Sequence, residues 1–293
     1  MLLPEFEFHE PLSISEALEL KQKLRSSARI LAGGTDLLVQ MKKKLVHADH
    51  LISLLRIREL TEFKKNRNCI KIGACMTMDA IASSPFIHKK FQALRQGALS
   101  LGNHLIRNRA TIGGNVCNAS PAGDTLCPLI VYNAMAILEN TENQRQIPVK
   151  KLFKGPGRIL MDDNEILTGF ILPMPAKNCG ASYIQLGKRK SSEINLVNVA
   201  SLIELEPETR IIKKARIALG AVGPTPIRSS NAEKILENRQ ASEDLFYEAG
   251  EQARHSDCSP IDDFRASAAY RKAMAGVLTK RTLKAACKLA QSQ

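Results

Sequence analysis

Two double glycines, Gly33–Gly34 and Gly113–Gly114, are the positions in this sequence where a ligand could approach the backbone. Glycine has no side chain and tolerates positive φ, and free N–H groups at the start of a following helix can bind an anion. Either turn alone is as typical of a simple chain reversal as of a ligand site. Two such turns in one chain favour a site.

The usual nucleotide fingerprints are absent from the sequence. Neither G-x-G-x-x-G nor G-x-x-x-x-G-K-[ST] occurs, which argues against a Rossmann site and a P-loop. Asp36, close after the first double glycine, would repel a phosphate at short range. We therefore expect the backbone amides of Gly33, Gly34 and Thr35 to make any phosphate contact, with the Asp36 carboxylate pointing elsewhere.

The cysteines indicate neither a disulfide framework nor a metal cluster. The chain has 7 of them, an odd number without any C-x-x-C pair, so buried reduced thiols are expected. Cys117 lies just after the second double glycine but has no cysteine or basic neighbour, which favours a packed thiol over a redox-active one. The sequence also shows no acid–base or nucleophile constellation.

The composition limits the classes of partner and the cellular location that can be expected. The formal charge of +13 is compatible with nucleic-acid binding. However, the chain has no Trp and only 4 Tyr and 9 Phe to stack on bases, and its basic residues are spread in short runs. A solvated surface or acidic partners are expected instead, and no nucleic acid. No apolar stretch is long enough for a membrane span, and the first ten residues are acidic where a signal peptide would be basic, so the cytoplasm is the expected location.

Alternating strands and helices are expected to position the two glycine turns. A capping box of Ser13 and Glu16 predicts a helix over 15–24, and a strand over 29–32 leads into the first turn and a helix from about 37 to 44. Further strands and helices are expected at 50–55, 68–74, 78–82, 88–101 and 110–112, followed by the second turn, a polar loop and a helix from 126.

A change of pattern follows the strand EILTGFILP, which Pro173 and Pro175 end. Beyond it, residues 182–186, 197–205 and 215–221 predict sequential antiparallel strands, and residues 231–290 are mostly helical by spacing. The length of 293 residues and this change together predict two or three packed subdomains.

Several strings carry a family resemblance over nearly the whole chain. ILAGGTDLL, IRNRATIGGN, ASPAGD, EILTGFILP and ASAAYRKAMAGVL occur in that order. The chain thus resembles the FAD-binding medium subunit of the molybdenum hydroxylases, a group that includes bacterial xanthine dehydrogenases and carbon monoxide dehydrogenase. The resemblance implies an α+β fold: an FAD-binding domain of the vanillyl-alcohol oxidase and p-cresol methylhydroxylase type over 1–176, in subdomains of about 1–60 and 61–176, and a flavoprotein C-terminal α+β domain over 177–293.

The resemblance also implies a set of flavin contacts. The expected cofactor-binding residues are Leu31, Ala32, Gly33, Gly34, Thr35, Asp36 and Leu37 around the first turn, Ile106, Ala110, Thr111, Gly113, Gly114 and Asn115 around the second, and Ser120, Asp124, Leu167 and Gln185. The sequence departs from the family at His104 and Leu105, where Pro-Gln is common, and at Gln185, where Lys is common. A neutral amide at 185 offers no positive charge to a reduced flavin.

The function implied by the resemblance is electron transfer. Substrate is hydroxylated at a molybdenum cofactor in a large partner subunit, and electrons pass through [2Fe–2S] clusters of a small partner subunit to non-covalent FAD here, then to NAD⁺ or another acceptor. The implied assembly is a dimer of heterotrimers, and no metal or catalytic side chain is expected in this chain. The alternative is a self-sufficient flavin oxidoreductase of the same wider fold.

Overall fold

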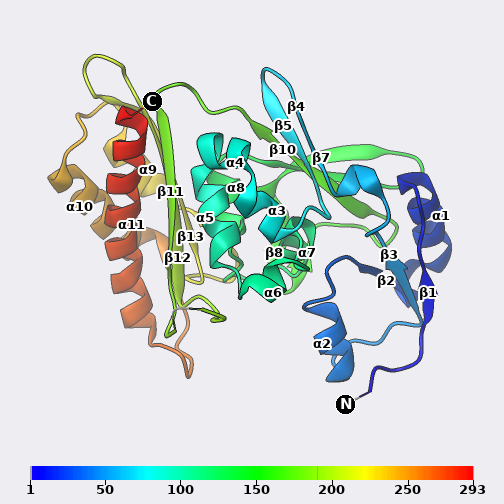
Figure 1. The fold of residues 1–293 in the computed structure, drawn as a ribbon. Helices are drawn as coiled ribbons and strands as arrows, with labels where there is room; N and C mark the ends of the chain where they lie inside the picture. The colour runs from blue at the N-terminus through cyan, green and yellow to red at the C-terminus, as the bar shows by residue number, and fades with distance from the viewer. Residues whose placement is uncertain (1, 190, 293) are drawn as a thin grey trace.

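The computed structural model describes residues 2–189 and 191–292 and arranges them around three main sheets (Figure 1). The N-terminal unit contains β1 (Glu7–His9), α1 (Ile14–Leu24), β2 (Ala28–Leu31), α2 (Leu37–Lys42) and β3 (His50–Ser53). Its three strands are parallel in the order β1-β3-β2, so their carboxyl ends meet at one edge. The first glycine turn leaves that edge directly after β2.

The predicted capping box starts α1. The Ser13 hydroxyl accepts a hydrogen bond from the Glu16 N–H at 3.2 Å, and the Glu16 carboxylate accepts one from the N–H of Leu12 at 2.8 Å. These bonds satisfy N–H groups that have no partner within the helix. The helix begins at Ile14, one residue before the expected start.

The central unit is an antiparallel sheet in the order β4-β5-β10-β6-β7 with helices packed against it. Its strands are β4 (Phe63–Lys65), β5 (Cys69–Gly73), β6 (Met135–Glu139), β7 (Gln144–Pro148) and β10 (Ile166–Pro173), with a small ribbon of β8 (Phe153–Gly155) and β9 (Arg158–Ile159). Its α-helices are α3 (Met78–Ser83), α4 (Pro85–Lys90), α5 (Gln92–Ser100), α6 (His104–Arg107), α7 (Ile112–Cys117) and α8 (Leu126–Val131).

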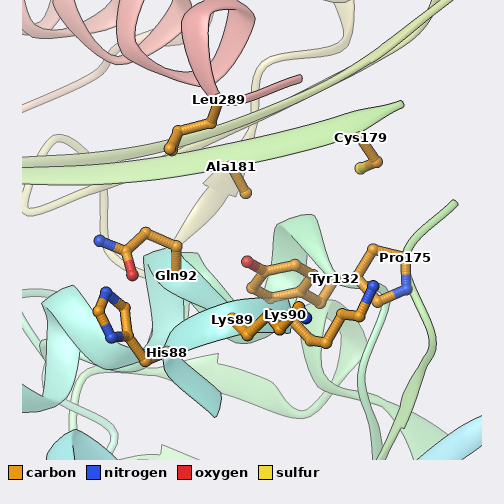
Figure 2. Close-up of a pocket in the computed structure, with 9 residues that line it drawn as sticks. All are labelled: His88, Lys89, Lys90, Gln92, Tyr132, Pro175, Cys179, Ala181 and Leu289. Carbon is orange, nitrogen blue, oxygen red and sulfur yellow. The ribbon is translucent and has the colours of Figure 1, made fainter. Parts of the chain in front are cut away.

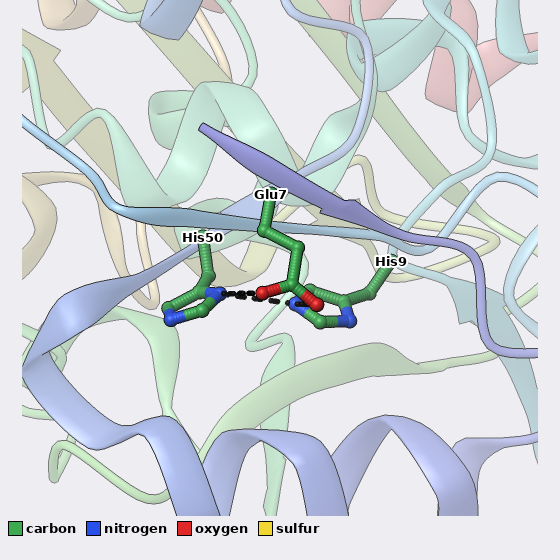
Figure 3. A group of neighbouring side chains, drawn as sticks. All are labelled: Glu7, His9 and His50. Carbon is green, nitrogen blue, oxygen red and sulfur yellow. Dashed lines mark hydrogen bonds and ion pairs between the residues drawn. The ribbon is translucent and has the colours of Figure 1, made fainter. Parts of the chain in front are cut away.

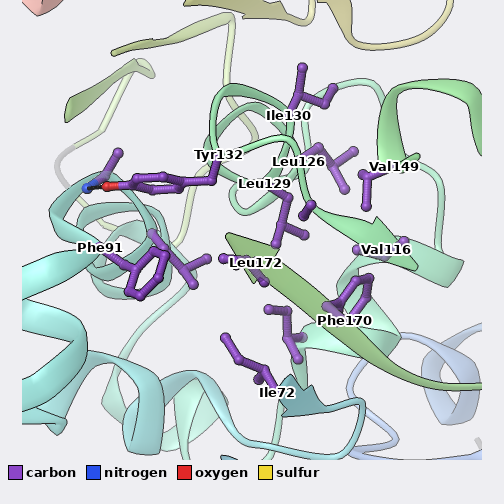
Figure 4. Packing of buried hydrophobic residues seen from close by; sticks show 14 of the residues in the cluster. Ile72, Phe91, Val116, Leu126, Leu129, Ile130, Tyr132, Val149, Phe170 and Leu172 are labelled. Carbon is purple, nitrogen blue, oxygen red and sulfur yellow. Dashed lines mark hydrogen bonds between the residues drawn. The ribbon is translucent and has the colours of Figure 1, made fainter. Parts of the chain in front are cut away.

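Aromatic packing explains one difference from the predicted elements. The helix expected over 88–101 is broken at Phe91, whose backbone is non-helical (φ −130°, ψ 52°) and whose ring is fully buried. That ring meets Tyr132 edge-on with centroids 5.1 Å apart, and the Tyr132 hydroxyl accepts a hydrogen bond from the N–H of Ala93 at 3.3 Å (Figure 4). The core thus fixes the boundary between α4 and α5.

Two other local predictions were wrong. Residues 110–112 are not a strand, because Thr111 is the N-cap of α7, and the second double glycine lies inside that helix rather than in a loop. The apolar run expected to be helical from 126 does not stay helical, because α8 ends at Val131 and Met135 begins the strand β6. In a short apolar run, periodicity alone does not distinguish a helix from a strand.

The C-terminal unit confirms the predicted antiparallel strands and most of the predicted helices. It consists of β11 (Cys179–Leu186), β12 (Val197–Leu205), β13 (Ile212–Gly220), β14 (Ile227–Arg228), α9 (Ser230–Leu236), α10 (Glu243–Gln252), a π-turn at Ala253–Asp257 and α11 (Ala268–Gln291). One face of the sheet packs against α11 and the other against α5 and α8 of the central unit. The same buried cluster therefore holds Phe91 together with Tyr183 and Leu202.

No α-helix in 2–189 or 191–292 is both long and apolar enough to cross a membrane.

Gly180 sets the spacing between β11 and α11. A Cβ at this position would lie 2.0 Å from the Ala286 carbonyl oxygen and 2.4 Å from the Ala290 nitrogen, both backbone atoms of α11. We expect Gly180→Ala to lower the free energy of unfolding by about 1–3 kcal/mol, because the helix has to move away from the sheet. Urea unfolding measures this.

Gly157→Ala provides the control for that variant. Gly157 has φ +69°, but no atom lies within 4 Å of the added Cβ, so this variant carries only a backbone penalty of about 1 kcal/mol. Gly180 does not have a positive φ, so a loss well below 1 kcal/mol in Gly180→Ala would show that the contact with α11 yields at little cost.

Candidate functional site

A cavity of about 530 Å³ lies between the N-terminal and central units, with loops of the C-terminal unit at its margin. Its volume is in the range of small-molecule sites. All the predicted cofactor-binding residues except Leu31 and Gln185 line it. Leu31 packs instead in an apolar cluster with Met41 and Leu51, and Gln185 lies on β11.

The first glycine turn touches the segment that leads into the second double glycine, in the wall of this cavity. A Cβ on Gly33 would lie 2.0 Å from the carbonyl oxygen of Arg109 and 3.0 Å from the Cα of Ala110. The backbone of the first turn therefore rests directly on the segment that leads into the second. Gly34 has φ +74°, a left-handed conformation that favours glycine.

The first turn presents unpaired backbone donors. Within the described residues, the N–H groups of Gly33, Gly34 and Thr35 donate to no protein acceptor. The Asp36 carboxylate accepts a hydrogen bond from the Asn118 amide at 3.4 Å, which links the two turns a second time. Burial raises the pKa of Asp36, and a hydrogen bond from Thr35 opposes the shift. Free donors on a glycine backbone are suited to an anion such as a diphosphate.

The second double glycine, inside α7, packs against Ala74 on one side and is open towards the cavity on the other. The N–H of Gly113 donates to the Ala74 carbonyl at 2.8 Å, and a Cβ on Gly113 would lie 2.7 Å from the Cβ of Ala74. A Cβ on Gly114, in contrast, would meet only the Thr111 hydroxyl, at 3.0 Å. The space in front of Gly114 is therefore available to a ligand.

Asn115 and Asp124 join the second turn to neighbouring elements. The Asn115 side-chain oxygen accepts bonds from the Thr125 N–H at 3.1 Å and the Thr125 hydroxyl at 2.7 Å. The Asp124 carboxylate accepts bonds from the Ser100 hydroxyl and the Asn195 amide, each at 3.0 Å. Burial raises the pKa of Asp124 to about 6 although these bonds oppose the shift.

Two basic residues in the cavity wall were missed by the sequence analysis. Lys21 and Arg29 both line the cavity. The Lys21 ammonium donates to the carbonyls of Arg25 at 2.6 Å and Ala28 at 3.3 Å, and burial lowers its pKa. Lys21 lies in an amphipathic helix with several other charged residues, so nothing in the sequence distinguished it from a surface lysine.

The thiols of the cavity are unreactive at neutral pH. Cys75 and Cys117 both line the wall, and burial raises the pKa of each to about 12. A thiol rather than a thiolate is therefore present, and a thiol is a weak nucleophile. The packed thiol expected for Cys117 fits this environment.

A second cavity of about 120 Å³ lies away from the glycine turns, between the α4–α5 region and the C-terminal unit (Figure 2). Lys89, Lys90, Tyr132 and Cys179 are among its lining residues. Burial raises the pKa of Tyr132, and that of Cys179 to about 12. It is a small hollow open to solvent, with the exposed residues His88 and Lys89 at its wall, and we assign no ligand to it.

The main cavity fits FAD in the chemistry of its donors. Free N–H groups and two basic side chains suit a diphosphate, and amide, hydroxyl and carboxyl groups suit the hydroxyls of a ribityl chain.

Comparison with known proteins supports a flavin-binding chain. Residues 4–175 match the family model of the FAD binding domain in molybdopterin dehydrogenase, and residues 182–286 match the CO dehydrogenase flavoprotein C-terminal domain.

The chain belongs to the FAD-binding medium subunits of the molybdenum hydroxylase family. It is 32% identical to the carbon monoxide dehydrogenase medium chain of Hydrogenophaga pseudoflava over 98% of both chains, and 27% identical to a putative xanthine dehydrogenase FAD-binding subunit of Escherichia coli over 94% of both. The solved Hydrogenophaga carbon monoxide dehydrogenase superposes with a TM-score of 0.93 at 31% identity, covering 99% of each chain.

The family assignment confirms the resemblance and the fold class inferred from the sequence. The chain is accordingly an oxidoreductase subunit whose cofactor is FAD. The individual flavin contacts and the domain boundary at 176 stay predictions.

Asp124 makes stability depend on pH. Its carboxyl has an ordinary pKa of 3.8 and a pKa of about 6 in the fold, so the folded chain binds the proton more tightly between these values. The stability that Asp124 contributes therefore falls as pH rises through this window. Asp124→Asn does not titrate, so its free energy of unfolding relative to the wild type should rise by about 1.4 kcal/mol per pH unit there.

Urea unfolding of FAD-free protein at several pH values measures this difference. Asp163→Asn, at an exposed aspartate, is the matched control. A difference between Asp124→Asn and wild type that stays constant across the window would contradict the raised pKa.

Gly114 provides a test of the cofactor site. We expect wild-type protein to carry one FAD that acid precipitation releases into the supernatant. Gly114→Val should lose it, because the isopropyl group fills the open space in front of the second turn, and Gly114→Ala should retain part of it. Flavin absorbance per chain measures the occupancy, and far-UV circular dichroism checks the fold. Full FAD occupancy in a folded Gly114→Val protein would place the flavin elsewhere.

Proposed function

We propose that this chain is the electron-exit subunit of a molybdenum hydroxylase: electrons from [2Fe–2S] clusters of a small partner subunit pass to bound FAD and leave in pairs to NAD⁺ or another acceptor. The observation that carries the proposal is the cavity lined by both double glycines, where the first glycine turn rests on the Arg109–Ala110 segment and presents unpaired N–H groups. Substrate is hydroxylated at a molybdenum cofactor in a large partner subunit.

The residues of this chain bind and orient rather than react. The amides of Gly33, Gly34 and Thr35 hold the diphosphate, and the Lys21 and Arg29 side chains supply positive charge near it. Asn115 and Asp124 fix the polar segment that follows α7. The protonated thiols at the cavity offer no nucleophile, which fits a subunit that transfers electrons without forming a bond to an organic substrate.

Exposed apolar side chains near the cavity support a protein partner there. Ile106 and Ile194 line the cavity and are 38% and 52% exposed, and Leu105 next to them is 76% exposed. Exposed hydrophobic residues that gather in one place mark interaction sites. The net charge of +13 in addition favours partners with acidic surfaces. We propose a dimer of heterotrimers as the assembly.

The proposal is tested by flavin reduction with and without the partners. Carbon monoxide, xanthine, nicotinate and glyceraldehyde, the compounds that name the relatives, are added anaerobically to the FAD-loaded subunit and to the complex purified from its source. We expect no bleaching of the flavin absorbance in the isolated subunit, because it has no electron source. The complex should bleach with its own substrate and recover when the acceptor is added.

Composition of the purified complex provides the second measurement. Molybdenum and iron should co-purify with FAD, and native mass spectrometry should find two copies of three different chains. Stoichiometric reduction of the isolated subunit by an organic substrate would overturn the proposal in favour of a self-sufficient flavin oxidoreductase.

A further inference from the structure

Glu7, His9 and His50 bring three ligand atoms together on the N-terminal sheet (Figure 3). The His9 Nε2 lies 3.2 Å from the His50 Nδ1 and 3.6 Å from a Glu7 carboxylate oxygen, and the His50 Nδ1 lies 3.3 Å from the other Glu7 oxygen. Figure 3 shows the carboxylate between the two imidazoles, which approach it from either side.

Strand pairing dictates this arrangement. Glu7 and His9 are two residues apart on β1, so their side chains share a face. β1 pairs in parallel with β3, and Glu7 lies directly opposite His50. The three Cβ atoms are therefore held by backbone hydrogen bonds rather than by flexible loops. A binding site whose ligands sit on paired strands is preorganised.

The spacing of the three atoms matches that of zinc ligands. With Zn–N and Zn–O bonds of about 2.0–2.2 Å, two ligands in a tetrahedral site lie about 3.3–3.6 Å apart. The two imidazole nitrogens lie 3.2 Å apart, and each lies 3.3 or 3.6 Å from a different oxygen of the Glu7 carboxylate. One ligand atom from each residue can be chosen so that all three lie within 4.8 Å of one another. Two imidazoles with a carboxylate select borderline metals such as Zn²⁺, whereas Ca²⁺ and Mg²⁺ prefer oxygen ligands alone.

Burial leaves room for a fourth ligand. The His9 and His50 side chains are 18% and 23% exposed, so the rings are restrained, whereas the Glu7 side chain is 64% exposed. A metal can thus enter from solvent, and a water molecule can complete its coordination.

We propose that Glu7, His9 and His50 form a three-ligand site for a divalent transition metal of the Zn²⁺ class, which clamps β1 to β3. β1 has only three residues and pairs only with β3 among the described strands. A metal bridging residues so far apart in sequence holds this short edge strand in place. The site lies at the amino end of β3, the opposite end of the strand from the cavity, and is independent of the flavin.

Zinc titration of the full chain, produced without a histidine tag and stripped with a chelator, tests the proposal. Calorimetry with ZnCl₂ gives the number of equivalents bound, and thermal unfolding gives the shift in Tm. Wild type should bind one equivalent more than His9→Gln, His50→Gln or Glu7→Gln, and Zn²⁺ should raise its Tm but not theirs. Mg²⁺ should have neither effect.

His47→Gln is the matched control. His47 also pairs with a carboxylate, Asp49, at 3.0 Å and is close to His50 in sequence, but its side chain is 74% exposed and outside the cluster. This variant should keep the extra equivalent and the Tm shift. FAD content and circular dichroism verify that each variant is folded.

Loss of zinc binding in His9→Gln and His50→Gln, with retention in His47→Gln, supports the site. Equal numbers of bound equivalents in wild type and all variants, or no zinc-dependent Tm shift in wild type, would overturn it. The three side chains would then form a hydrogen-bonded cluster only.

Discussion

The site depends on a contact between two stretches of backbone that leaves no room for a side chain. Gly33 lies against the Arg109 carbonyl, and Gly113 lies in the same way against Ala74 at the end of β5. The first contact joins the N-terminal unit to the segment before α7, and the second joins α7 to the central sheet. A methyl group at either glycine would force the backbone that it contacts to shift, so the shape of the cavity depends on the absence of a side chain at Gly33 and at Gly113.

The C-terminal unit contributes to the same site in part through the buried amide of Asn195. Asn195, 2% exposed, donates to the Asp124 carboxylate at 3.0 Å and to the Ala122 carbonyl at 2.9 Å. These bonds fix the polar segment after α7 from the side away from the N-terminal unit. Because an unpaired buried carboxylate is costly, Asp124 and Asn195 constrain each other across the units. The flavin cavity is therefore a property of all three units.

Sequence reasoning predicted best what depends on local chemistry. The capping box at Ser13 and Glu16, the strand before Gly33 and the sequential antiparallel strands after Pro175 were all predicted from neighbouring residues. The break at Phe91 could not be, because it arises from packing against Tyr132, far along the chain. Lys21 and Asn195 were missed for the same reason: their roles depend on carbonyls and carboxylates that only tertiary structure brings near. The flavin was predicted from the family resemblance. The residue spacing alone predicted only two glycine turns.

The free N–H groups of the first turn give the cofactor a structural role. A donor without a protein partner must be satisfied by solvent or by a ligand, and in the site proposed above FAD would satisfy several donors at once. The N-terminal unit has a small sheet of three short strands, and one apolar cluster joins it to Cys75 and Ile166 of the central unit. The contact of Gly33 with Arg109 adds to this attachment beside the cavity. A ligand that binds only when the turns meet therefore stabilises the docked arrangement in proportion to its affinity, so flavin binding and attachment of the N-terminal unit are linked equilibria.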